Sequence, residues 1–250
     1  HNNYIRGCIM PTITIKVFGR KIVAFFILML FYGCGENGDP SREPELFSQS
    51  NNPQELIQNA TEKQRIGAYD EAIVILRRAL ELDPKFVATH IRMGLVYDEA
   101  DQRKEAIESF NKALKVEPEN FSARVGLAEV YSKMIRNDLA VAELLKAEAV
   151  RPKDIELLFK IALEYWYDQK LKETAEYYNK VLAIDPNHTQ THLNLISVYE
   201  NLENWEKALE EIETSKQLGK KNDNSQTIAI AERKLAFIKG RMNMTKKDYK

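Results

Sequence analysis

Prolines at a fixed spacing are the feature of this sequence that most restricts its fold. Pro84, Pro118, Pro152 and Pro186 follow one another at intervals of 34 residues. A proline has no backbone N–H and disfavours helical geometry in the residue before it, so each of the four is expected to end a helix. A period of this length indicates an array of stacked repeats. The sequence therefore predicts a repeat protein whose units each close at a proline.

Other positions come into register when the sequence is aligned on these prolines. Small residues recur in two columns and tyrosines in a third. The small-residue columns hold Ala72, Ala106, Ala140, Thr174 and Ala208, and Ala79, Ala113, Ala147, Val181 and Ser215; the tyrosine column holds Tyr97, Tyr131, Tyr165 and Tyr199. Small residues allow two helices to approach closely, and the tyrosines are expected to fill the space between repeats. The pattern predicts helical hairpins that bury their apolar faces by stacking on one another.

These columns resemble the tetratricopeptide repeat, a helix–turn–helix unit of 34 residues. The clearest copy runs from Ala68 to Pro84, with the sequence AYDEAIVILRRALELDP. Five repeats are expected, at residues 53–86, 87–120, 121–154, 155–188 and 189–222. The resemblance implies an all-α fold, a right-handed superhelical solenoid of about five repeats whose concave groove is lined by the first helix of each repeat.

One more helix is expected after the fifth repeat, at residues 223–240. Ser225 could cap its start, and Gly240 is a plausible stop. Apolar residues recur between them at helical spacing, as Ile228, Ala231, Leu235 and Ile238. The pattern predicts a capping helix with one apolar face, followed by a basic tail at residues 241–250.

Residues 1–33 are typical of a targeting segment. They contain no acidic residue and end in an apolar run of twelve residues from Ile22 to Gly33. This run is shorter than the about 20 apolar residues that a membrane-spanning helix needs, but it fits a secretory signal. The stretch from Leu30 to Cys34, Leu-Phe-Tyr-Gly-Cys, resembles the lipobox of bacterial lipoproteins.

The lipobox resemblance implies cleavage after Gly33 and attachment of lipid to Cys34. Residues 34–52, rich in Gly, Pro, Ser and Asn, would then form a flexible tether. We expect a lipid-anchored protein of the bacterial cell envelope, in the outer membrane more readily than in the inner. An uncleaved signal anchor with an unmodified Cys34 is the alternative.

No motif in the sequence indicates an enzyme. Nucleophile-elbow, P-loop, paired-cysteine and dinucleotide fingerprints do not occur. His188 and His192 lie four residues apart, but Thr189 stands where a zinc protease would carry its catalytic glutamate. With 36 basic and 37 acidic residues, the chain also lacks the positive charge of a general nucleic-acid binder. We expect no catalytic residue, no cofactor, no metal site and no nucleic-acid partner.

The concave groove is the expected binding site. In the fourth repeat Phe159, Leu163, Trp166 and Tyr167 lie on one face of the first helix, where they offer aromatic anchors of the kind that dominate binding. The other groove residues that the resemblance implies are Leu95, Asp98, Glu99, Glu129 and Lys133. The alternative interpretation places Phe159 and Leu163 in the core, with Tyr167 shielding them.

These features together predict a membrane-anchored scaffold that binds a segment of a partner protein in its groove. Two alternatives remain open at this point. One is an assembly factor for an outer-membrane machine such as a type IV pilus secretin. The other is a non-lipidated, anchored adaptor built from the same repeats.

Overall fold

The computed structural model describes residues 50–248, and within this range all regular secondary structure is helical. Cys34, the expected signal segment and most of the expected tether lie outside the described residues. Eleven helices follow one another: α1 (Pro53–Arg65), α2 (Tyr69–Leu82), α3 (Val87–Glu99), α4 (Arg103–Val116), α5 (Phe121–Lys133), α6 (Asn137–Val150), α7 (Ile155–Tyr167), α8 (Leu171–Ile184), α9 (Thr189–Asn201), α10 (Trp205–Lys221) and α11 (Ser225–Asp248).

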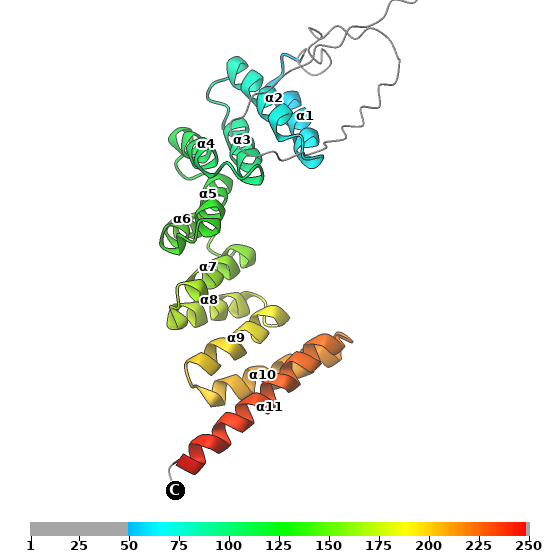
Figure 1. The fold of residues 1–250 in the computed structure, drawn as a ribbon, viewed down its shortest axis with the longest axis vertical. Helices are drawn as coiled ribbons and strands as arrows, with labels where there is room; N and C mark the ends of the chain where they lie inside the picture. The colour runs from blue at the N-terminus through cyan, green and yellow to red at the C-terminus, as the bar shows by residue number, and fades with distance from the viewer. Residues whose placement is uncertain (1–49, 249–250) are drawn as a thin grey trace, which may run out of the picture. The chain divides into compact units, whose positions relative to one another are not determined.

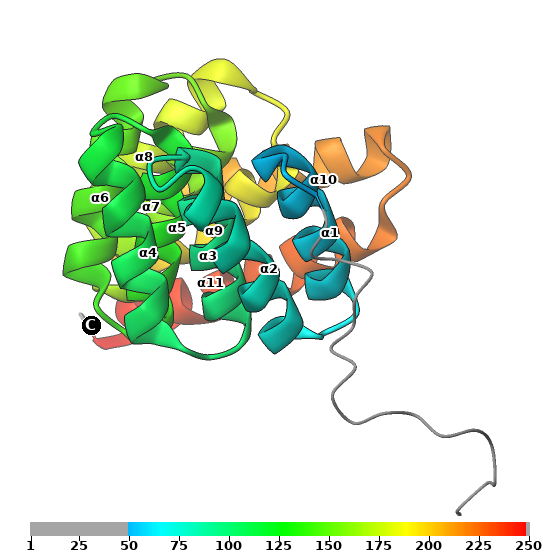
Figure 2. The ribbon, with the colours of Figure 1, turned by 90° about the horizontal axis from the view of Figure 1, so that it is seen from above.

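The first ten helices form five hairpins that stack in sequence order, from α1/α2 to α9/α10 (Figure 1). The last helix, α11, packs against α10 and α9. Seen along the stack, the hairpins turn about its axis, with α4 and α6 on one side and α1 and α10 on the other (Figure 2). The prediction of an all-α superhelical solenoid of helix–turn–helix units with a final capping helix is confirmed.

The backbone conformation also repeats, both at the turn inside each hairpin and at the turns that join successive hairpins. The second residue after the first helix adopts a left-handed conformation in every repeat, at Gly67, Asp101, Ile135, Gln169 and Glu203. In the first four repeats the second helix ends two residues before a periodic proline, and Asp83, Glu117 and Asp185 have the extended backbone that a following proline favours. The prolines therefore end the helices as expected.

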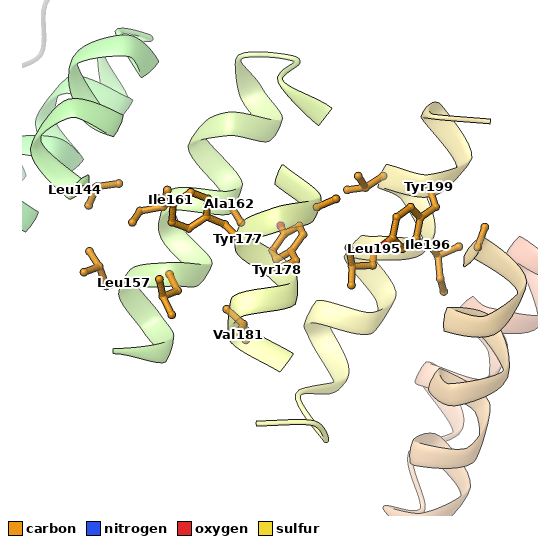
Figure 3. Close-up of a cluster of buried hydrophobic side chains, with 14 of the residues drawn as sticks. Leu144, Leu157, Ile161, Ala162, Tyr177, Tyr178, Val181, Leu195, Ile196 and Tyr199 are labelled. Carbon is orange, nitrogen blue, oxygen red and sulfur yellow. The ribbon is translucent and has the colours of Figure 1, made fainter. Parts of the chain in front are cut away.

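The apolar side chains form two core clusters along the solenoid. One joins α1 to α5 around Leu76 and Phe110, and the other joins α5 to α11 around Tyr178. In the second cluster, side chains from α6, α7, α8 and α9 point into the spaces between successive helices (Figure 3). Both small-residue columns are buried in these clusters or beside them. Because each cluster spans several repeats, a single hairpin could not bury its apolar face by itself.

Phe110 shows why small residues are needed on the first helices. Its fully buried ring lies against Gly94 of α3 and Gly126 of α5. A Cβ atom at Gly94 would come within 2.7 Å of the ring, and one at Gly126 within 2.5 Å. Either distance is shorter than van der Waals contact, so the two glycines let α3, α4 and α5 pack around one aromatic side chain.

The last helix differs from the expectation at both of its ends. Asn224, and not Ser225, caps its start, because the Asn224 Oδ1 accepts a hydrogen bond from the Thr227 N–H at 3.0 Å. The helix continues through Gly240 to Asp248, so it includes most of the residues assigned to a basic tail. Gly240 does not adopt the left-handed conformation through which a glycine ends a helix, and its position in the interior is tolerated.

Candidate functional site

A cavity of about 220 Å³ lies between α7 and α9, on the side of the groove. Leu163, Trp166 and Tyr167 of α7 form one wall, and Tyr178 of α8 contributes to the lining. The other wall comes from α9, with Asn194, Ser197 and Val198. The cavity is smaller than the about 300–1,000 Å³ typical of small-molecule sites, so it fits one side chain of a partner better than a whole cofactor.

The sequence of α7 presents these residues on one face. Asp154 caps the helix by accepting a hydrogen bond from the Leu157 N–H at 3.0 Å. Leu163 precedes Trp166 by three residues and Tyr167 by four, so the three side chains lie on one side of the helix. The opposite face is buried in the second core cluster, through Leu157, Leu158, Ile161 and Ala162.

Exposure differs among the three wall residues. Tyr167 is 60% exposed, whereas Leu163 and Trp166 are partly buried against the core. A half-buried tryptophan beside an exposed tyrosine combines a rigid anchor with accessible apolar surface. This arrangement is the one expected of a contact for a partner's side chain.

Phe159 has a supporting position and does not line this cavity. Its ring centroid lies 5.4 Å from that of Tyr178 and 5.4 Å from that of His188. Tilted ring pairs at this distance attract each other, so the Phe159 ring, which packs against both His188 and Tyr178, supports Tyr178. The structure therefore brings together three of the four aromatic and apolar residues expected in repeat 4 and packs the fourth behind them.

Tyr178 adds polar atoms to the cavity. Its hydroxyl oxygen accepts a hydrogen bond from the Asn194 Nδ2 at 2.8 Å. Burial raises the pKa of Tyr178 to about 12, and the bond from Asn194 only partly opposes this shift. The phenol is therefore neutral at physiological pH and can still donate its own proton.

A second cavity, of about 200 Å³, lies on the other side of α7, against α5. Its lining combines polar and apolar side chains: Ala128, Glu129, Ser132 and Lys133 come from α5, Leu144 from α6, and Lys160 and Glu164 from α7. Glu129 and Lys133 thus line one cavity together, and it is a different cavity from that of the aromatic residues.

The remaining expected groove residues lie in the C-terminal half of α3. Asp98 is buried, and its carboxylate accepts a hydrogen bond from the Lys133 Nζ at 2.6 Å and pairs with Arg103. Glu99 is exposed and accepts a hydrogen bond from the Gln64 Nε2 at 2.8 Å. Leu95 packs partly buried against the first core cluster. These residues connect neighbouring repeats to one another.

Several lining residues were not among those expected from the sequence. Ser197 occupies the ninth position of repeat 5, so extending the groove register by one repeat would have found it. Glu164 would have been found because the same position is a valine in repeats 2, 3 and 5, whereas the terminal repeat 1 has the exposed Glu62 there. Tyr178 carries no such signal, because it comes from a second helix, which is expected to lie on the convex side.

Two larger hollows lie at turns between repeats, with volumes of about 500 and 350 Å³. Neither borders the groove residues named above. Among the helices of residues 50–248, none is both long and apolar enough to span a membrane. The same residues contain no group of three or more His, Cys, Asp or Glu side chains placed to hold a metal ion.

Comparison with known proteins identifies the repeat. Models of the tetratricopeptide repeat match residues 60–86, 99–159 and 155–188. A search of curated protein sequences found no relative that matches this chain.

Solved structures with the same fold include three informative examples. The MamA protein aligns with a TM-score of 0.62 at 20% identity, covering 69% of this chain and 94% of its own. YrrB, described as a TPR protein with an unusual peptide-binding site, aligns with a TM-score of 0.59 at 25% identity, covering 74% and 92%. The pilF protein of Pseudomonas aeruginosa aligns with a TM-score of 0.56 at 21% identity, covering 73% and 90%. The helical array of this chain is therefore a solenoid of tetratricopeptide repeats.

Proposed function

We propose that this protein is a scaffold that binds an unstructured segment of a partner protein in its groove, with a bulky apolar side chain in the cavity between α7 and α9. The observation that carries the proposal is this cavity. Its walls combine half-buried Trp166 and exposed Tyr167 with the polar side chains of Asn194 and Ser197. Apolar walls with a few polar groups suit one side chain and the backbone that carries it.

The repeat architecture supports the same function. Tetratricopeptide repeats are generally interaction scaffolds, and YrrB, which has a similar fold, is described as having a peptide-binding site. The likeness to pilF at 21% identity concerns the fold. Assembly of an outer-membrane machine is therefore kept as an alternative that the identity of the partner would decide.

Anchoring at a membrane of the bacterial cell envelope is the second part of the proposal. It is supported by the apolar run from Ile22 to Gly33 and by the lipobox-like stretch that ends at Cys34. Lipid on Cys34 would hold the groove near the membrane surface, in the outer membrane more readily than in the inner. The carbon chains of such a lipid contribute about 0.8 kcal/mol for each buried CH₂ group.

Cross-linking in intact cells tests the groove. The variant Trp166→Ala/Tyr167→Ala is compared with the wild-type protein and with Phe237→Ala, which removes a half-exposed aromatic from α11. We expect the double variant to lose at least 90% of the captured partner, measured by quantitative mass spectrometry, with unchanged circular dichroism. Phe237→Ala should capture the partner normally. Equal capture by all three proteins would show that the aromatic face is not the binding site.

Metabolic labelling with a clickable fatty acid tests the anchor. The wild-type protein should take up the label and sediment with membranes, and Cys34→Ala should do neither. A membrane-bound but unlabelled Cys34→Ala protein would support the uncleaved signal anchor instead. In the cross-linking experiment, captured pilus or secretin components would favour the assembly-factor alternative, and captured cell-wall enzymes would favour a scaffold for those enzymes.

A further inference from the structure

Glu164 occupies a position that is apolar in the neighbouring repeats. The tenth residue of the first helix is Val96 in repeat 2, Val130 in repeat 3 and Val198 in repeat 5, and all three valines are fully buried. In repeat 4 the residue is Glu164, which is only 8% exposed. A buried carboxyl group in a core column lowers stability unless it is paired, so its presence indicates a role other than packing.

The carboxyl group of Glu164 is incompletely satisfied within the described residues. Its Oε2 atom is buried and has no hydrogen-bond partner, although the residue lines the cavity between α5 and α7. Burial raises the pKa of Glu164, while a hydrogen bond from Ser132 and the charge of Lys160 lower it to a smaller extent. A residue of the cavity lining therefore carries a buried acceptor that no side chain among residues 50–248 uses.

The cations around this cavity are already paired with other carboxylates. Lys160 is bound to Glu129, and Lys133 donates to the Asp98 Oδ2 at 2.6 Å. Arg103 pairs with Asp98 and with Asp101. Glu164 belongs to none of these ion pairs. Of the two carboxylates that line the cavity, Glu129 is paired and Glu164 is not.

We propose that Glu164 is the receptor for one basic side chain, lysine or arginine, of the bound partner segment. This inference rests on the proposed function and deepens it, because it names the chemistry of a second contact in the same groove. The incoming cation would supply the missing donor to Oε2 and balance the unpaired charge. Hydrogen bonds between ionised groups are about twice as strong as neutral ones, and the buried position would strengthen this bond further.

The position of α7 between the two cavities sets the spacing of the recognised residues. A helix with its side chains is about 10–12 Å across, so the cavities on its two sides lie roughly that far apart. An extended chain advances about 3.3 Å per residue. A segment that crosses α7 in extended form would therefore place a basic residue and a bulky apolar residue about three positions apart.

Selection from a phage-displayed library of random ten-residue peptides tests this inference on the full-length protein in detergent. We expect the wild-type protein to enrich peptides with Arg or Lys about three positions from an aromatic or large aliphatic residue. Replacing that arginine by citrulline, a neutral side chain of nearly the same shape, should weaken binding at least tenfold. The affinities are measured by fluorescence polarisation.

Two variants assign the effect to the carboxyl group. Glu164→Val restores the residue found in repeats 2, 3 and 5, so it should fold, melt at a higher temperature and bind the arginine and citrulline peptides equally. Glu156→Val removes an exposed glutamate from the same helix and should keep the tenfold preference for arginine.

The possible outcomes separate this inference from the proposed function. If peptides are enriched and depend on Trp166 and Tyr167, but show no preference for a basic residue, the groove function stands and the role of Glu164 is wrong. The same conclusion follows if Glu164→Val keeps the preference for arginine. If the wild-type protein enriches no peptide, both proposals are overturned.

Discussion

The two halves of the solenoid share one repeat pattern but differ in how closely their first helices approach. In the N-terminal half, α1, α3 and α5 pack directly side by side, and glycines at 94 and 126 receive the ring of Phe110. In the C-terminal half, α7 approaches α5 and α9 much less closely. At the positions that Gly94 and Gly126 occupy in their helices, α7 carries Ala162 and Lys160.

The second helices keep the solenoid continuous where the first helices separate. Glu148 of α6 accepts a hydrogen bond from the Tyr177 hydroxyl of α8 at 2.8 Å and from the Lys180 Nζ at 3.2 Å. The space beside α7 is thus limited to the groove side, where both small cavities lie. The comparison shows that one repeat fold can either bring its first helices into direct contact or leave cavities between them.

Truncation of Phe110, the buried aromatic side chain of the N-terminal half, should have the largest effect on stability. Phe110→Ala removes a fully buried ring shared by α3, α4 and α5, and we expect the free energy of unfolding to fall by about 3–5 kcal/mol. Urea denaturation followed by circular dichroism measures this loss. Phe237→Ala, at a half-exposed site, is the control and should cost much less. Equal losses would contradict the role assigned to Phe110.

Adding one methyl group to a contact glycine should have a smaller effect. The new Cβ in Gly126→Ala would collide with the Phe110 ring, and such overpacking costs about 1–3 kcal/mol. Gly240→Ala is the matched control, because nothing lies within 4 Å of its Cβ position. That change should stabilise α11 by up to about 1 kcal/mol through helix propensity. The melting temperatures of both variants test this prediction. A higher melting temperature for Gly126→Ala would show that the close approach of the Phe110 ring to residue 126 does not require glycine.

The C-terminal half should respond to pH through His192. Its Nδ1 lies 2.6 Å from the Glu211 Oε2 and its Nε2 lies 3.0 Å from the Pro186 carbonyl oxygen, so both ring nitrogens face acceptors. Burial lowers the pKa of His192, but these hydrogen bonds outweigh it and the pKa is raised overall. The charged ring is therefore favoured in the folded state.

The sign of the pH effect follows from this shift. A raised pKa contributes stability that is fully present below the ordinary value of 6.5 and is lost as the pH rises through the higher pKa of the folded state. We expect the melting temperature to fall over this range in the wild-type protein and to fall less in Glu211→Gln. Parallel pH profiles for the two proteins would show that the pair does not contribute.

The smallest effect is expected at the turn between α5 and α6. Ile135 has a φ of 58°, a left-handed conformation that is unfavourable for a β-branched residue, and its side chain is 83% exposed. Ile135→Asn should stabilise the protein by about 1 kcal/mol, because asparagine tolerates this backbone. Gln169→Asn, at the same position of the next repeat, should change the melting temperature less. A destabilised Ile135→Asn would indicate that the exposed isoleucine contacts another part of the protein.

Much of the architecture could be predicted because the same local sequence signals occur in several repeats. Each periodic proline ends a helix, and the small-residue columns are buried wherever two helices meet. The last helix was predicted less well, since it occurs once. Its true cap, Asn224, and its continuation through Gly240 depend on a single local conformation that no second copy supports.

The groove was predictable only in part. Trp166 and Tyr167 were expected from their shared helical face, and they line one cavity together. Asp98 and Lys133 were expected as separate groove residues, yet they bind each other across two repeats. An ion pair between residues 35 positions apart can be predicted only when the relative position of the first helices in neighbouring repeats is known. This relative position depends on tertiary packing.

The sequence by itself determined the helical hairpins, their number and their order, because proline positions and apolar periodicity act locally and recur. Only the tertiary structure decided which first helices touch and which stand apart. That outcome depends on how Gly94, Gly126 and the large residues of α7 fit against neighbours from other repeats. For the same reason, only the structure could show that the acceptor of Glu164 is left without a partner beside a cavity.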